Sequence, residues 1–292
     1  MAESEITMKS MKKLLPILPA LSILAILAAC DKATSGPKDA VSTTPKGESA
    51  RPAHWGYEGP DGPEYWPALN PAYAACGQGK TQSPIDIVKT AGGEVNSWKF
   101  DYKTTSLKIA HHEHVTDIVD NGHTIQVSVE GGTTITTDRG VYSLKQFHFH
   151  TPSEHTVDGR HFPMEVHFVH QSAAGNFAVV SALFTEGAAN ENLAKLIAHF
   201  PKAKGDANHF PNEKLDLAPH LPTNTSAYSY IGSFTTPPCT ENVEWFVFRE
   251  PVPASRDQLK AFADRLHDNN RPVQPSHDRT IGNATVAGAF AQ

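Results

Sequence analysis

The sequence lacks an excess of positive charge and has only three cysteines in 292 residues. Its 25 Lys and Arg stand against 31 Asp and Glu, which gives a net charge of −6 with histidine neutral. The first 30 residues carry three Lys and two Glu, a net +1, so the remainder carries −7. Because an acidic chain offers no electrostatic footprint for phosphate backbones, we expect no nucleic-acid partner.

Neither a collagen-like nor a disordered chain fits the composition, which is 39% hydrophobic and 9% aromatic. A chain of 292 residues can bury a full-sized core, as one large domain or two small ones. The unusual feature is histidine, of which there are 16.

The N-terminus has the pattern of a secretory signal. Lys9, Lys12 and Lys13 precede an apolar run over residues 14–29, which is too short to span a bilayer comfortably. A basic start, a short apolar stretch and small residues at its end are typical of export. We therefore expect residues 1–30 to be a signal peptide; a short membrane anchor is the alternative.

The apolar run ends in Leu27-Ala28-Ala29-Cys30, which resembles a bacterial lipobox. In that motif the cysteine is lipidated and becomes the mature N-terminus, so Cys30 is a candidate lipid anchor, with simple cleavage nearby as the alternative. Residues 31–52 are rich in Ser, Thr, Pro, Gly and Lys and predict a flexible linker. The expected location is the periplasm or the cell envelope.

The other two cysteines are Cys76 and Cys239. If Cys30 carries lipid, these two remain in an oxidising compartment and are enough for one disulfide. Such a bond would close a loop of about 164 residues and contribute at most about 5 kcal/mol in the chain-entropy model. Two free buried thiols are the alternative.

From Trp55 onward the chain becomes aromatic and apolar, and no second linker interrupts it. Gly, Asn and Asp clusters separate β-rich runs, which predicts strands over residues 115–119, 124–130, 133–137, 141–150, 164–170, 177–184 and 243–248. Apolar stripes predict one helix after Asn190 and another after Ser255 and Gln258, which form a capping-box pattern. One β-dominated domain with peripheral helices is the best fit.

Two of the predicted strands carry histidines at alternating positions. In a strand, residues two apart project from the same face, so His148 and His150 point together while Phe147 and Phe149 enter the other layer. The run over residues 165–169 repeats the alternation and places His167 on the face of Glu165.

If these two strands are neighbours, three imidazoles converge on one point. A tetrahedral zinc ion with three protein ligands keeps its fourth position open, which is the arrangement of a catalytic site. The alternative is a set of half-buried histidines that are hydrogen-bonded within the sheet.

The sequence resembles the α-class carbonic anhydrases from residue 54 to residue 275. The matching segments occur in order at residues 54–57, 82–87, 121–123, 146–150, 153–159, 165–167, 232–238 and 270–275. The resemblance implies an α+β, β-dominated single domain, built on a large, mostly antiparallel twisted central sheet with peripheral helices. We expect this catalytic domain to span residues 53–286, followed by a tail at 287–292.

The resemblance implies that Zn²⁺ is the cofactor and that three residues bind it: His148, His150 and His167. Gln146 would accept a hydrogen bond from His148, and Glu165 one from His167. The backbone carbonyl of Asn269 would serve His150. The implied activity is reversible hydration of carbon dioxide to bicarbonate and a proton by a zinc-bound hydroxide, a group whose pKa zinc lowers to about 7.

Thr235 and Glu154 match the family's pair that orients the hydroxide. An ionised Glu154 can only accept a hydrogen bond, so the Thr235 hydroxyl donates to it and accepts from the hydroxide. His123 matches the family's proton shuttle, and Tyr57 and Asn121 would order water between it and zinc. The residues that match the apolar substrate pocket are Val169, Val180, Phe234, Thr236 and Trp245.

The resemblance also pairs Cys76 with Cys239 as the disulfide of exported family members. His155 would make structural hydrogen bonds beside Glu154. We expect six further histidines at the surface: His161, His199, His209, His220, His267 and His277.

Two other functions remain open at this stage. The same hydroxide can attack activated esters, which suggests a zinc hydrolase, and a silent carbonic-anhydrase-like domain could serve binding alone. Such silent domains typically lack a zinc histidine, whereas all three are present here. The oligomeric state stays unassigned.

Overall fold

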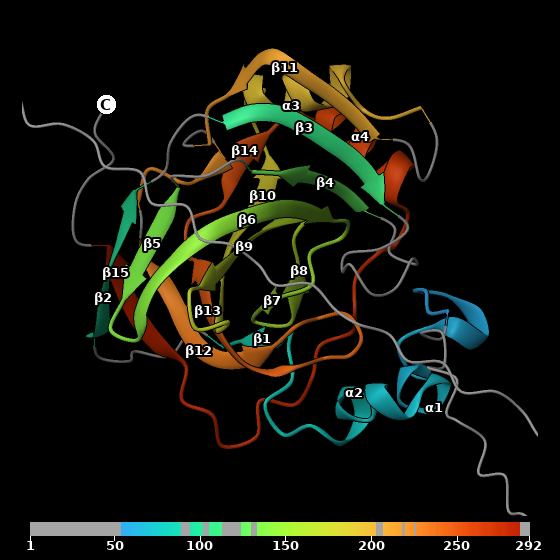
Figure 1. The fold of residues 1–292 in the computed structure, drawn as a ribbon, viewed down its shortest axis with the longest axis vertical. Helices are drawn as coiled ribbons and strands as arrows, with labels where there is room; N and C mark the ends of the chain where they lie inside the picture. The colour runs from blue at the N-terminus through green and yellow to red at the C-terminus, as the bar shows by residue number, and fades with distance from the viewer. Residues whose placement is uncertain are drawn as a thin grey trace, which may run out of the picture. The chain divides into compact units, whose positions relative to one another are not determined.

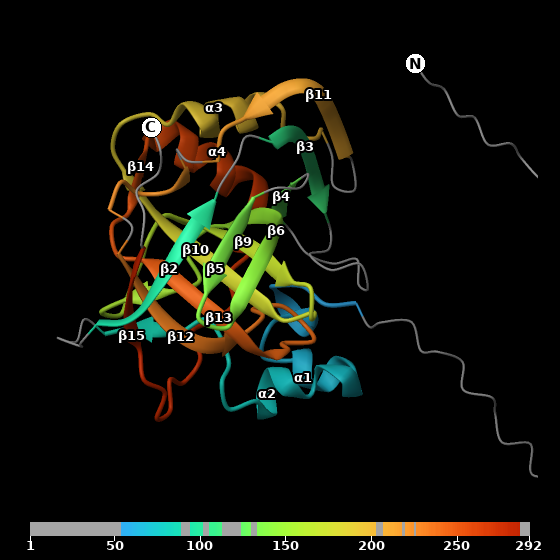
Figure 2. The same cartoon turned by 60° about the vertical axis from the view of Figure 1, so that its left-hand side comes forward.

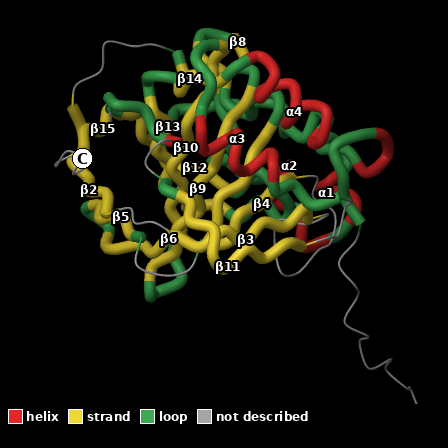
Figure 3. Tube along the Cα trace, turned by 90° about the horizontal axis from the view of Figure 1, so that it is seen from above, coloured by secondary structure: helices red, strands yellow, loops and turns green. Residues whose placement is uncertain are grey.

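The computed structural model describes residues 54–88, 94–101, 105–112, 124–129, 133–202, 207–217, 220–224 and 226–286. Strands dominate these residues, as Figures 1 and 3 show. No helix in the described ranges is both long and apolar enough to cross a membrane.

Most of the strands belong to one large sheet, which has twelve strands among the described residues. Its members are β2 (Glu94–Asp101), β3 (Thr105–His112), β4 (Thr124–Ser128), β5 (Thr134–Thr137), β6 (Gly140–His150), β9 (Met164–Ser172), β10 (Phe177–Glu186), β11 (Ala207–Leu215), β12 (Ala227–Ser233), β13 (Glu241–Phe248), β14 (Val252–Ala254) and β15 (Gly282–Val286). A small sheet holds β1 (Asp86–Ile87), β7 (Thr156–Val157) and β8 (Arg160–His161).

The large sheet is mixed but mostly antiparallel. Strand β10 runs parallel to β13 and β14, and β15 runs parallel to β2, whereas the other pairs are antiparallel. Strand β6 pairs with β4, β5 and β9, so the sheet branches there. This arrangement confirms the expected fold class and makes β6 the central strand of the site.

Two helices lie together near β3 and β11, away from α1 and α2 (Figures 1 and 2). They are α3 (Glu191–Ala198) and α4 (Arg256–Leu266). Ser255 caps α4, with the predicted capping box to Gln258 in place, and the Asn190 side chain caps α3. The short elements near the start are α1 (Trp66–Leu69), α2 (Ala75–Gln78) and the 3-10 turns Gly59–Asp61 and Pro71–Tyr73.

The two faces of β6 and β9 bury different side chains. Phe147 and Phe149 enter the main hydrophobic core with Phe168, and Phe149 packs against Phe262 of α4 at 4.6 Å between ring centroids. The intervening histidines point away from this core, as the alternation predicts. Burying the aromatic rings under α4 therefore orients the histidines on the opposite face.

The alternation along β6 is interrupted once. Leu144 pairs with His170 and Gln146 pairs with Val169, so Lys145 is an extra residue that forms a β-bulge. Tyr142 and Leu144 are in the core before the bulge, and Phe147 is in it afterwards. The bulge thus reverses which positions of the strand face the core.

The strand predictions fit where local alternation is strong, as in β4, β5, β6, β9, β10 and β13. The run predicted at 115–119 lies outside the described residues. Strands β2, β3, β11, β12, β14 and β15 are additional to those that the sequence predicted.

Candidate active site

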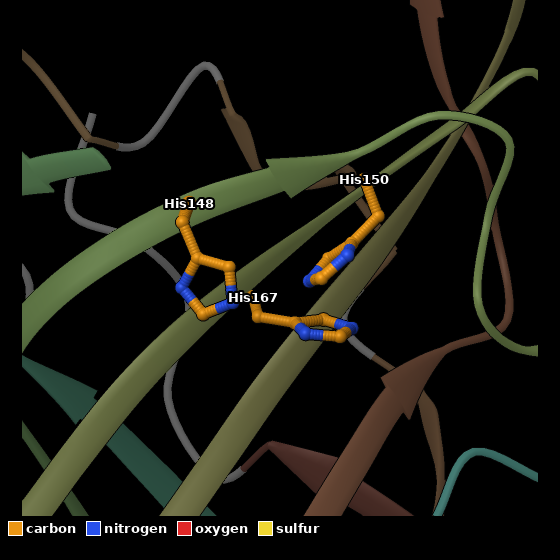
Figure 4. Close-up of side chains that lie close together, drawn as sticks. All are labelled: His148, His150 and His167. Carbon is orange, nitrogen blue, oxygen red and sulfur yellow. The ribbon is translucent and has the colours of Figure 1, made fainter. Parts of the chain in front are cut away.

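Three imidazoles converge beside β6 and β9. His148 lies directly opposite His167 in the strand pairing, and Glu165 lies opposite His150. The rings of His150 and His167 are 4.5 Å apart between centroids, and those of His148 and His150 are 5.0 Å apart. Figure 4 shows the three side chains turned toward one another.

Each histidine uses one ring nitrogen for a protein acceptor. His148 Nδ1 lies 2.8 Å from Gln146 Oε1, and His150 Nδ1 lies 2.8 Å from the carbonyl oxygen of Asn269. His167 Nε2 lies 2.8 Å from Glu165 Oε1. These contacts favour a proton on the bonded nitrogen and leave a lone pair on the other nitrogen of each ring.

Glu165 is the most heavily bonded of these acceptors. Its Oε2 accepts from the backbone N–H groups of Glu154 and His155, both at 2.8 Å. Its Oε1 accepts from His167, from His155 Nδ1 at 2.7 Å and from the Ser181 hydroxyl. Burial raises the pKa of this carboxyl, but His155, His167 and the hydrogen bonds outweigh that effect and hold the pKa well below its usual range.

The chain of hydrogen bonds continues outward from Glu165. His155 Nε2 lies 2.6 Å from the Tyr230 hydroxyl, which lies 2.9 Å from Ser83 Oγ. This confirms the structural role expected for His155. His155, Glu165 and His167 also lie close enough together to be a second metal set, but their facing atoms already bond one another.

Burial keeps the three converging imidazoles neutral. It lowers the pKa of His150 to about 4 and holds that of His148 well below its usual value. It also lowers the pKa of His167, against the attraction of Glu165. Neutral imidazole is the form that binds metal ions.

The three facing nitrogens fit a metal ion. The candidate ligand atoms all lie within 4.8 Å of one another, and His150 Nε2 is buried without a hydrogen-bond partner. A buried orphan nitrogen is costly unless something binds it. Three neutral histidines, each with an orienting acceptor, form the donor set of a zinc site with one open position.

Glu154 is fully buried beside this cluster. Burial raises its pKa to about 7, while His167, the Thr235 hydroxyl and the Arg271 backbone N–H lower it. That N–H donates to Glu154 Oε1 at 2.8 Å. Thr235 is 5% exposed, and Glu154 Oε2 is buried without a hydrogen-bond partner among the described residues.

A cavity of about 610 Å³ opens from the histidines. Its floor carries His148, His167 and Thr235, and one wall is apolar. The apolar wall is formed by Val169, Phe177, Val179, Phe234 and Trp245. A pocket of this kind suits a small apolar molecule beside a metal ion.

The carbonic anhydrase family accounts for this geometry. The model of the eukaryotic-type carbonic anhydrases matches residues 61–285. A carbonic anhydrase of Pectobacterium carotovorum is 40% identical over 229 residues, covering 78% of this chain and 90% of that protein. The chain belongs to the α-class carbonic anhydrase family.

Other relatives agree with this assignment. A carbonic anhydrase of Neisseria gonorrhoeae is 39% identical over 230 residues, covering 78% of this chain and 87% of that protein. The structure of an α-carbonic anhydrase from Thermovibrio ammonificans, solved with sulfanilamide, has a TM-score of 0.72 at 41% identity and covers 79% of this chain and 99% of its own. Reversible hydration of carbon dioxide is the family activity, and the family enzymes use zinc.

The structure of this carbonic anhydrase brings most of the sequence-predicted residues together. Thr236 also lines the cavity, and Gln146 and Asn269 make the expected contacts with histidines. Tyr57 lines a second cavity together with Asn269. Burial, and then the charge of Glu154, hold the pKa of Tyr57 well above its usual value. His123, Asn121 and Cys30 lie outside the described residues.

The expectation that Val180 lines the pocket is wrong. Val180 is fully buried in the core with Phe168, its partner across the strands. Its neighbour Val179 pairs with Val169 and faces the cavity instead. The alternation of this strand is readable in the sequence, but its two faces are both apolar, so the sequence does not say which one faces the histidines.

Cys76 and Cys239 form the expected disulfide, with 5.0 Å between their Cα atoms. Arg271 stands beside it and is 1% exposed; its guanidinium donates to the carbonyls of Cys76 and Ser83 at 2.7 Å. Because the Arg271 backbone N–H also donates to Glu154, Arg271 contacts both the disulfide-bonded segment and Glu154. The sequence match covered Arg271 but gave it no role.

The expectation that His220 is a surface residue is wrong. Its side chain is fully buried, and neither ring nitrogen has a hydrogen-bond partner among the described residues. Its ring lies 5.4 Å from that of Phe147 and 6.4 Å from that of Phe168, on the core face of the sheet. In contrast, His161, His267 and His277 are exposed and His199 is half-buried, while the side chain of His209 is outside the described part.

Proposed function

We propose that His148, His150 and His167 hold the catalytic zinc ion at which this carbonic anhydrase hydrates carbon dioxide reversibly. The observation that carries the proposal is the pairing of three neutral, converging imidazoles with three separate acceptors. When bound, zinc supplies a hydroxide nucleophile at neutral pH by lowering the pKa of water to about 7, a value for which carbonic anhydrase is the standard example.

Glu165, Gln146 and the Asn269 carbonyl orient the three ligands. Each acceptor fixes the tautomer of one imidazole and keeps its lone pair aimed at the common centre. Because Glu165 is itself held by His155, Ser181 and two backbone N–H groups, the orientation of His167 is set before any metal arrives.

Thr235 and Glu154 orient the nucleophile. The pKa of Glu154, about 7 in the protein alone, falls further beside a divalent cation, so the carboxylate is ionised and can only accept. The Thr235 hydroxyl therefore donates to Glu154 and accepts from the nucleophile. That arrangement aims the nucleophile's lone pair at the carbon atom of the substrate.

The substrate position lies against the apolar wall. Carbon dioxide has no net charge or dipole, so Val169, Val179 and Trp245 can hold it beside the nucleophile without competing for the metal. Phe234 and Thr236 close the same cavity. Bicarbonate, which is charged, is bound less well by this wall and leaves.

Proton export is assigned to His123, with Tyr57 and Asn121 ordering the water between. An imidazole that titrates near neutrality accepts a proton and passes it to buffer. This assignment is supported by the match of residues 121–123 to the family pattern.

We also assign residues 1–30 to an export signal, residues 31–52 to a linker and Cys30 to lipid attachment in the cell envelope. The basic start, the short apolar run and the lipobox-like end support this assignment. A disulfide in the body is consistent with an oxidising compartment. The catalytic domain would then span residues 53–286.

Stopped-flow hydration of carbon dioxide tests the function and the shuttle together. The zinc-loaded chain should hydrate carbon dioxide rapidly, and His123→Ala should lower turnover about tenfold or more in weak buffer, with recovery on adding imidazole. His161→Ala is the control, because His161 is an exposed histidine whose ring, among the described residues, contacts the Ser153 carbonyl at 2.6 Å from Nδ1. Unchanged weak-buffer turnover in His123→Ala would remove the shuttle assignment, and no hydration by the zinc-loaded wild type would remove the function.

A further inference from the structure

Lys145 lies at the catalytic cavity because of the β-bulge in β6. Counted back from Phe147 and Phe149, strict alternation would put Lys145 on the core face, whereas counted on from Leu144 it would leave the core. The extra residue reverses the alternation, so that Lys145 and Gln146 both leave the core. Lys145 is exposed and lines the cavity that holds His148 and His167. Bulges next to active sites commonly redirect a side chain in this way.

Lys145 is also the one formally charged side chain among the described residues that line this cavity. The polar part of the lining is otherwise formed by amides and hydroxyls, including Gln126, Gln171 and Thr240. The part of the cavity lining that the structure describes therefore carries a positive charge, in a chain whose net charge is −6.

The Lys145 ammonium is available to a ligand. Its backbone carbonyl accepts from Val129 N–H at 3.0 Å, which fixes the bulge, whereas no carboxylate in the described ranges pairs with its side chain. Three residues of strand separate Lys145 from His148, so their Cα atoms are roughly 10 Å apart. A long lysine side chain at that distance, with no carboxylate partner in the described ranges, can act on a charge in the cavity.

We propose that Lys145 attracts small monovalent anions, bicarbonate included, into the catalytic cavity. This proposal rests on the proposed function, because bicarbonate occupies this cavity only as the product and reverse substrate of that reaction. The ammonium favours the anion over the neutral substrate, since carbon dioxide gains nothing from the charge. Lys145 is thus a binding residue for one side of the reaction, and it offsets the repulsion of an acidic chain.

A catalyst leaves the equilibrium between carbon dioxide and bicarbonate unchanged. The charge of Lys145 therefore acts on how tightly anions bind, on the KM for bicarbonate and on inhibition of hydration by product. It does not change the ratio of kcat/KM in the two directions. Direct anion binding is consequently the sharpest readout.

The test uses the full chain with cobalt(II) in the zinc site, because the visible absorption of cobalt(II) changes with its ligands. The Kd of thiocyanate is measured for the wild type, Lys145→Gln, Lys145→Glu and Lys145→Arg. Lys260→Gln is the control for total charge, since it removes one positive charge from α4, on the core side of the sheet, where Lys260 pairs with Asp264. Stopped-flow hydration by the zinc-loaded wild type is recorded alongside.

We expect Lys145→Gln to weaken thiocyanate binding about threefold and Lys145→Glu about tenfold, as Coulomb attraction at this distance in a partly solvated cavity implies. Lys145→Arg should restore the wild-type Kd. The differences should disappear at about 1 M salt, where the Debye length is about 3 Å. Bicarbonate inhibition of hydration should follow the same order.

Equal Kd values for the wild type and Lys145→Glu would overturn the proposal, and so would an equal shift in Lys260→Gln. A shift that persists unchanged at high salt would overturn it too, because it would reflect packing rather than charge. The failure of the proposed function is a separate result: the zinc-loaded wild type would then show no hydration, whatever the thiocyanate Kd values are.

Discussion

The two faces of β6 and β9 both bury histidine, yet they treat it in opposite ways. On one face, His148, His150 and His167 each have an acceptor for one nitrogen and a shared direction for the other. On the other face, His220 lies among phenylalanine rings, and neither of its nitrogens has a partner in the part of the chain that the structure describes. The difference shows that burial alone does not make a histidine a candidate metal ligand; an orienting acceptor together with a shared direction for the other nitrogen does.

The energetic consequences of the two environments also differ. Desolvation lowers the pKa of the histidines on both faces, to about 4 for His150 and about 3 for His220. On the face that carries His148, His150 and His167, here called the metal face, the neutral state is the useful one, because zinc binds neutral imidazole. On the core face nothing uses it, so His220 costs the free energy of two unmade hydrogen bonds.

The largest expected effect comes from removing the acceptor that most distinguishes the metal face. Glu165→Gln discards the charge that holds His155 and His167. We expect zinc affinity to fall about tenfold to 100-fold. We also expect the free energy of unfolding to fall by about 3 kcal/mol or more, because a buried charged network loses its centre. Competition with a chelator and denaturant unfolding measure the two effects.

Ser181→Ala is the control for that change, because it removes only one neutral donor to the same carboxylate. It should cost about 1 kcal/mol and leave zinc affinity nearly intact. If Glu165→Gln behaved like Ser181→Ala in both measurements, the acceptor would not be what separates the two faces.

The disulfide should support the metal face more than the core face. It joins Cys76 to Cys239, next to the loop that carries Thr235, and Arg271 links it to Glu154. Complete reduction should lower the free energy of unfolding by about 2–4 kcal/mol. Calorimetry before and after reduction measures the loss, and an unchanged melting temperature would contradict the expectation.

A smaller change should improve the core face. His220→Leu removes two unmade hydrogen bonds and should raise the free energy of unfolding at pH 7 by about 1 kcal/mol or more. It should also flatten the acid dependence. The pKa of His220 is about 3 when folded against 6.5 for an ordinary imidazole, so between these values the unfolded chain binds a proton that the folded chain does not. The free energy of unfolding therefore decreases as the pH is lowered through this range, by about 2 kcal/mol from pH 6.5 to pH 5.

His170→Leu gives the contrast, because burial also lowers the pKa of His170 to about 3 but its Nδ1 bonds the Phe168 carbonyl at 2.9 Å. That variant should lose stability at pH 7. Denaturant unfolding at pH 7 and pH 5 distinguishes the two. A His220→Leu protein that is less stable at pH 7 and keeps the full acid slope would show that His220 is satisfied.

Much of the metal face could be predicted from the sequence, because strict alternation fixes which side chains share a face. His148 and His150 alternate with phenylalanines, and Glu165 precedes His167 by two, so only the pairing of the two strands had to be supplied. The family resemblance supplied it. The capping box at Ser255 was equally local, and it is present in α4.

What the sequence did not reveal depends on contacts between distant segments. Lys145 and Gln146 both leave the core because one extra residue is accommodated against β9, and no local signal marks that residue as extra. The sequence predicted Val180 rather than Val179 in the pocket because both faces of β10 are apolar. Only the contacts with other strands decide which face lines the cavity. His220 is covered by rings from β6 and β9, more than fifty residues earlier in the chain.

The central claim is that three oriented histidines make a catalytic zinc site. The most direct test measures zinc content and carbon dioxide hydration on the same preparations of the wild type, His148→Ala and His161→Ala, with melting curves to confirm folding. We predict about one zinc ion per chain and rapid hydration for the wild type and His161→Ala, both lost in folded His148→Ala. Wild-type protein that binds no zinc, or a His148→Ala protein that keeps both zinc and hydration, would contradict the account.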